Sequence, residues 1–141
     1  FYSHFASNRP GFDPAFALAR YHPDGSLDGS FGDNGVVTTP ISDNPDEGHA
    51  LVIQADGKIV VAGYSDNGAN IDFALARYKP NGTLDTGFGA NGIVLTRSEG
   101  GSNLLKHEHP DQAVLSSAIA LAPNGALVVV GEKGVGGWSP N

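Results

Sequence analysis

Short runs of apolar residues, separated by glycine, asparagine and aspartate turns, dominate the chain. The runs 51–53 and 59–62 flank an Asp-Gly turn, and the runs 118–122 and 126–130 flank an Asn-Gly turn. Apolar, β-branched runs around such turns predict hairpins, because glycine accepts the positive φ that the turns require. Phe-Ala-Leu-Ala-Arg-Tyr from Phe16 predicts a third kind of strand, and Gly-Val-Val-Thr-Thr predicts a fourth. No convincing amphipathic helix is expected.

This pattern is repeated. Residues 15–37 and 72–94 are close copies, offset by 57 residues, and the hairpin 49–63 recurs at 117–131 after an insertion. A period in the fifties points to propellers or arrays of repeats. Four short strands per unit, nearly apolar on both faces, predict a blade packed between other blades.

The repeated unit resembles the Delta-60 repeat of bacterial β-propellers. The matching motifs are Phe-Ala-Leu-Ala-Arg-Tyr, Pro-x-Gly-x-Leu-Asp, Phe-Gly-x-Asn-Gly and Ala-Leu-x-Ile-Gln-x-Asp-Gly-Lys-Ile-x-Val-Ala-Gly. The resemblance runs roughly from Phe16 to Gly131 and implies an all-β propeller fold. It implies little about activity. Since these repeats are mostly known from large surface or secreted proteins, an extracellular or cell-surface location in a bacterium is expected.

We predict a single propeller segment over residues 1–141, with about two blades' worth of four-stranded antiparallel structure. An outer strand pair (16–38) precedes a complete blade (49–96), and an inner strand pair (117–131) follows it. The two pairs are complementary halves of a split blade. Unpaired strand edges invite pairing with another chain. Either identical chains complete each other's blades, about three or four of them closing a ring, or the chain is part of a longer propeller.

Composition and charge narrow the functional classes. Asp and Glu number 15 against 8 Lys and Arg, and an acidic chain repels phosphate backbones, so nucleic-acid binding is disfavoured. No apolar run is long enough to insert into a membrane. Cysteine is absent, and no Gly-x-Ser-x-Gly elbow or phosphate loop is present. A noncatalytic interaction or scaffold module is therefore favoured over an enzyme.

Two acidic or histidine-containing segments are candidate metal sites. His107, His109 and Asp111 lie in the insertion and could bind Zn²⁺, which makes a metal-dependent hydrolase or lyase one alternative. Asp43, Asp46 and Glu47 could offer oxygen ligands to Ca²⁺. Their spacing does not match the twelve-residue calcium loop, and aspartates also cap turns through their own backbone. No cofactor is otherwise expected.

The aromatic residues divide into two groups. Those on linkers could stack on a sugar, so a carbohydrate-binding propeller is a further alternative, with Tyr64, Asp66 and Trp138 as candidate ligand-binding residues. Those that recur at the period are expected to pack the blades, and Arg20 and Arg77 are expected to pair with aspartates. The structural repeat residues are Phe16, Arg20, Tyr21, Asp28, Phe73, Arg77, Tyr78 and Asp85.

Overall fold

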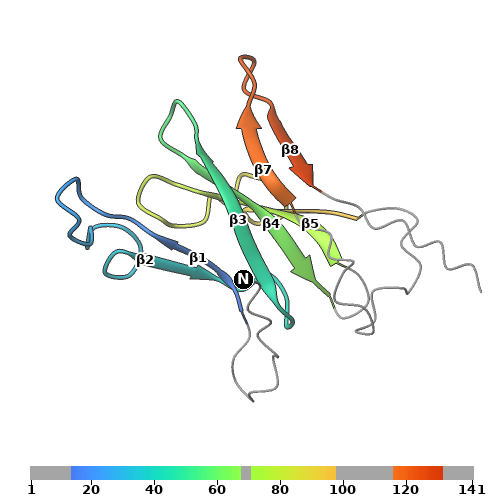
Figure 1. The fold of residues 1–141 in the computed structure, drawn as a ribbon, viewed down its shortest axis with the longest axis horizontal. Helices are drawn as coiled ribbons and strands as arrows, with labels where there is room; N and C mark the ends of the chain where they lie inside the picture. Colours follow the sequence, from blue (N-terminus) through green and yellow to red (C-terminus); the bar gives the residue numbers. More distant parts are fainter. Residues whose placement is uncertain (1–13, 68–70, 98–115, 132–141) are drawn as a thin grey trace, which may run out of the picture.

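The computed structural model describes residues 14–67, 71–97 and 116–131. These residues form three antiparallel sheets and no helix (Figure 1), which confirms the all-β class and is consistent with partial propeller blades. The first sheet has two strands, the central sheet has four in the order β3-β4-β5-β6, and the last has two. The strands are β1 (Phe16–Ala19), β2 (Val36–Thr39), β3 (Asp46–Ile53), β4 (Ile59–Asp66), β5 (Ile71–Tyr78), β6 (Ile93–Thr96), β7 (Ser116–Leu121) and β8 (Leu127–Gly131).

The last sheet repeats the inner half of the central sheet, including an irregularity. Leu51 faces Val61 across β3 and β4, and Ile119 faces Val129 across β7 and β8. Each pair has a bulge at the same position, between Gly48 and Ala50 in the first case and at the corresponding residues of β7 in the second. A bulge inserts an extra residue and bends the strand, so the two hairpins share both register and curvature.

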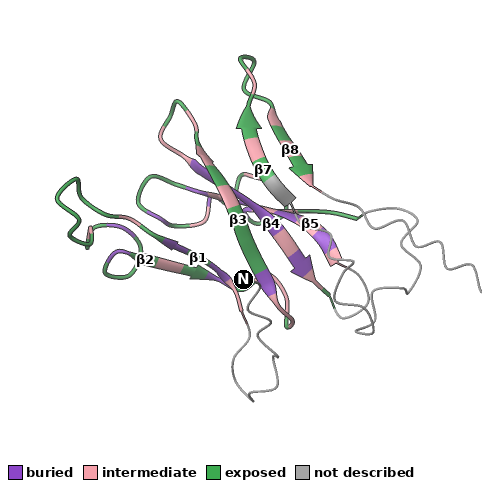
Figure 2. Cartoon of the chain, in the orientation of Figure 1, coloured by how far each residue is buried: buried purple, intermediate pink, exposed green. Residues whose placement is uncertain are grey.

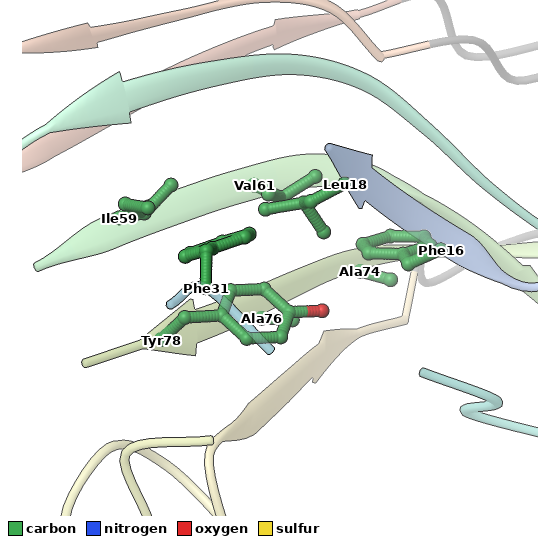
Figure 3. Close-up of a cluster of buried hydrophobic side chains, with 8 residues drawn as sticks. All are labelled: Phe16, Leu18, Phe31, Ile59, Val61, Ala74, Ala76 and Tyr78. Atoms are coloured by element: carbon green, nitrogen blue, oxygen red, sulfur yellow. The ribbon is translucent and has the colours of Figure 1, made fainter. Parts of the chain in front are cut away.

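The first sheet packs its apolar face on the central sheet (Figure 3). Phe16, Leu18 and Phe31 meet side chains that project from β4 and β5. The partners on the central sheet are Ile59, Val61, Ala74, Ala76 and Tyr78. The Tyr78 hydroxyl donates a hydrogen bond to the Thr39 hydroxyl at 2.8 Å. A buried apolar layer between the two sheets is therefore closed at one side by a polar contact.

The opposite face of the central sheet carries the last sheet. Side chains alternate along a strand, so Val60 and Ala62 point away from the first sheet, and both are fully buried. β7 lies against β3 and β4 on this side. On β8, Leu127 and Val129 are half-buried, whereas Val128 and Val130 are exposed. The central sheet is thus a complete blade between two half-blades.

Two sequence-based expectations were wrong in detail. Tyr64 and Asp66 were expected to lie on a linker, but β4 continues to Asp66. Tyr21 was expected to pack like Tyr78; instead it is 62% exposed, and Tyr78 is fully buried. Tyr78 lies between two sheets, whereas the described residues supply no sheet to cover Tyr21. Figure 2 shows that buried residues are concentrated on β4, whereas the residues of β8 are intermediate or exposed.

Candidate functional site

The edge of β1 that faces away from β2 is open within the described part of the chain. β5, its repeat equivalent, is paired on both sides, with β4 and with β6. β1 is paired with β2. The Arg20 amide donates to the Gly35 carbonyl at 3.0 Å, and successive amides of a strand point in opposite directions. The amides and carbonyls of Ala17 and Ala19 therefore face the open edge.

β8 has a matching open edge at the other end of the described structure. The Ala122 amide donates to the Ala126 carbonyl at 2.8 Å, which fixes which groups of β8 face β7. By the same alternation, the amides of Leu127, Val129 and Gly131 point to the side away from β7. No strand among the described residues pairs with that side. An unpaired edge of this kind is a template for another strand.

An apolar groove of about 390 Å³ runs beside the open edge of β1. Its walls come from β1, β3 and β4, including Leu18, Ile59 and Val61, with Phe31 from the segment that follows β1. Leu51 and Ile53 also line it and are 54% and 64% exposed. In the central blade, the equivalent space beside β5 is filled by β4 and β3. The groove therefore has the position of a missing inner strand pair.

An arginine clamps the turn of each repeat. Arg20 Nε donates to Asp28 Oδ2 at 2.8 Å, and its guanidinium carbon lies 4.7 Å from the centre of the Phe31 ring. Arg77 makes the same contact with Asp85 at 2.9 Å. These pairs join the end of one strand to the turn that follows it, so their role is architectural.

The two arginine–aspartate pairs differ in the additional group that contacts the aspartate carboxylate. In the central blade, Lys58 Nζ lies 3.4 Å from Asp85 Oδ2. In the half-blade, the Ser30 hydroxyl donates to Asp28 Oδ1 at 2.6 Å. Hydrogen bonds from Ser30, and then the Arg20 guanidinium, lower the pKa of Asp28 from 3.8 to about 2. The half-blade aspartate is thus satisfied without a lysine.

A polar cluster spans β3 and β4, formed by Glu47 and His49 on β3 and Tyr64 on β4. The Tyr64 hydroxyl donates to Glu47 Oε2 at 2.9 Å, and the His49 ring centre lies 5.6 Å from that of Tyr64. Burial, and then the adjacent Glu47 carboxylate, raises the pKa of the Tyr64 phenol. Tyr64 and Asp66 were named as loop residues for a ligand; both belong to β4. Glu47 and His49 were not predicted as Tyr64 partners, and only their strand register would have indicated it.

The three candidate calcium ligands differ in burial, and the buried one is engaged by the backbone. Asp46 is almost completely buried, and its carboxylate accepts hydrogen bonds from the Ile41 and Ser42 amides at 2.7 and 2.9 Å. Asp43 and Glu47 are exposed. Within the described ranges, no group of three or more His, Cys, Asp or Glu side chains could hold a metal. Asp46 is a turn former here.

The remaining candidates lie outside the described residues, namely His107, His109, Asp111 and Trp138. In the described part of the chain, no helix is long and apolar enough to cross a membrane.

Comparison with known proteins supports the propeller interpretation. Residues 12–31 and 54–88 match the family described as a domain of unknown function (DUF5122) beta-propeller. The chain is similar to this family over β1 and its turn, and over β4, β5 and the turn after β5. No curated protein and no solved structure matched the chain.

Proposed function

We propose that this chain is a noncatalytic scaffold module that completes a β-propeller through its open strand edges. In this proposal, binding occurs by addition of strands to β1 and β8, and the partner strands come from another blade repeat. One observation carries it: a complete blade is flanked by two half-blades whose exposed edges are those that are paired inside the complete blade.

The chemistry of the site favours recognition of strands over catalysis. Its walls are mainly apolar side chains, and its specific groups are the main-chain donors and acceptors of Ala17 and Ala19. Main-chain hydrogen bonds give affinity in strand addition, and pockets for alternate side chains give specificity. The resemblance to Delta-60 repeats further supports a role in a secreted or surface protein of a bacterium.

Amide hydrogen exchange at the open edge of β1 tests this function. The measurement compares the chain alone with the chain plus a synthetic peptide of residues 116–131. We expect the Ala17 and Ala19 amides to be protected in at least one of these states, because a paired strand shields them from exchange. A peptide carrying Val129→Pro, which removes an edge donor, serves as the control. Free exchange of both amides in both states would contradict the proposed function.

A further inference from the structure

The last sheet is a copy of the strand pair that lies beside β5 in the central blade. β7 and β8 reproduce the register and the bulge of β3 and β4. β1 is the sequence copy of β5, which pairs with β4. We propose that β8 of a second copy of this chain pairs with β1, so that two chains build one blade. This inference rests on the proposed function and specifies its partner.

The repeat gives the register of this blade between chains. In the central blade, Val61 is opposite Ala76 and Ile59 is opposite Tyr78. Transferring these pairs to the repeat equivalents puts Val129 of one chain opposite Ala19 of the other, and Leu127 opposite Tyr21. Val129 and Ala19 are also residues whose main-chain groups face the two open edges, so each can donate to and accept from the other.

The side chains that this pairing would cover are apolar and exposed in the single chain. Val128 and Val130 are 57% and 58% exposed on the face of β8 that points away from the central sheet. Their equivalents Val60 and Ala62 are fully buried against the next sheet. In the proposed blade, the two valines face the groove that includes Leu51 and Ile53. Burial of apolar surface on both sides drives such an association.

The substitutions at the turn fit the same pairing. The equivalent of Lys58, which contacts Asp85 in the central blade, is Ala126 at the start of the β8 run. β8 therefore brings no lysine to Asp28, and Asp28 already accepts the Ser30 hydroxyl in place of one. The equivalent of Ser30 in the central blade is Gly87, which has no side chain to offer. Asp85 is thus contacted by Lys58 within the central blade, and Asp28 by Ser30 within the half-blade.

Contacts between neighbouring sheets extend the interface beyond the paired edges. Arg20 Nη1 donates to the Pro80 carbonyl at 2.6 Å, and the Gly32 amide donates to the Asn81 carbonyl at 2.8 Å. Together with the hydrogen bond from Tyr78 to Thr39, these two hydrogen bonds link the first sheet to the central one. The repeat predicts the same set between chains, in which the exposed Tyr21 of one copy donates to Thr96 of the other. This would cover the tyrosine that the single chain leaves in solvent.

Cysteine cross-linking tests the register, because the natural sequence has no cysteine. Chains carrying Ala19→Cys are mixed with chains carrying Val129→Cys under mild oxidation. Directly opposite strand residues have a Cα separation of about 5.5 Å or less, within reach of a disulfide. We expect the disulfide between one chain of each type to be the main covalent product. Leu127→Cys, two residues along the same face, is the matched control and should cross-link to Ala19→Cys several-fold less.

The other outcomes separate this inference from the proposed function. Equal cross-linking by the Val129→Cys and Leu127→Cys chains would overturn the register. If no cross-link forms while the 116–131 peptide protects Ala17 and Ala19, the second copy is excluded as the partner and the strand-adding function stands. If no cross-link forms and both amides exchange freely, both proposals fail.

Discussion

At the residue scale, the same residue type has a different environment in each copy of the repeat. Arg20 and Arg77 make equivalent contacts with Asp28 and Asp85, as their recurrence at matching positions suggested. Tyr21 and Tyr78 also recur, but one is exposed and the other buried. Recurrence identifies an architectural residue. Recurrence does not indicate in which copy the residue is buried, because burial depends on neighbouring sheets that the local sequence does not specify.

The Asp28 carboxylate should make stability depend on pH in the acid range. Its pKa is about 2 in the folded chain against 3.8 ordinarily. A group whose pKa is lowered by folding stabilises the fold above its unfolded pKa and loses that contribution as the pH falls. We therefore expect Asp28→Asn to lower the free energy of unfolding near pH 6 and to reduce its fall between about pH 4 and pH 2.

Urea unfolding across that pH range measures this effect. Asp33→Asn is the matched control, because Ala90 is its equivalent in the other repeat and a carboxylate there is dispensable. An unchanged pH dependence in Asp28→Asn would show that the clamp contributes nothing to stability.

Gly63 should tolerate no side chain. A Cβ at this position would overlap the Glu47 carbonyl of the paired strand and approach the Phe16 ring. We expect Gly63→Ala to destabilise the fold by about 1–3 kcal/mol, the usual cost of overpacking. Gly29→Ala is the control, since nothing lies within 4 Å of a Cβ there and its φ is not positive. Thermal unfolding of both variants checks this; equal melting temperatures would contradict it.

At the element scale, the strands were predictable and their ends were not. The hairpin turns follow from Asp-Gly and Asn-Gly, and Gly57 and Gly125 adopt the positive φ that these turns need. The extension of β4 to Asp66 was missed because Ser65 and Asp66 are typical turn residues. Pairing with β5 overrides that local preference. The groove was not predicted either, since it is formed by β1 and β3, which the repeat pattern assigns to different blades.

The hydrogen bond between Tyr78 and Thr39 should stabilise the packing of the first sheet on the central one. Removing it with Tyr78→Phe is expected to cost about 1 kcal/mol of unfolding free energy, the net value of a typical hydrogen bond. Tyr21→Phe is the matched change on an exposed ring, and it should leave the stability of a single chain unchanged. Equal losses in the two variants, measured by urea unfolding of unassociated chains, would contradict this role.

Lysine on the outward face of β8 should block association without unfolding the chain. Val130 is exposed in the single chain, whereas the proposed blade buries it, and an unpaired buried charge is strongly unfavourable. We expect Val130→Lys to weaken association by at least tenfold. Leu95→Lys is the control, because Leu95 is also exposed and its repeat equivalent is the polar Thr38. Sedimentation over a concentration series gives both values, and comparable association of the two variants would rule out this face as the interface.

At the scale of the whole molecule, two half-blades lie on opposite faces of a complete blade. The sequence predicted this split because its two repeat offsets, for the outer and inner strand pairs, could be read separately. It could not predict that both open edges would be flanked by exposed apolar side chains, since that depends on how the sheets stack. The eight strands of the described residues and rings of about four to eight blades are compatible with closed assemblies of about two to four copies.

The absolute mass of the unmodified chain in solution shows directly whether copies complete each other's blades. Light scattering after size exclusion gives this mass without assumptions about shape. If copies complete each other's blades, the mass is about two to four times 14.5 kDa and stays constant on dilution through the micromolar range. A stable, fully folded species of 14.5 kDa at all concentrations would contradict it.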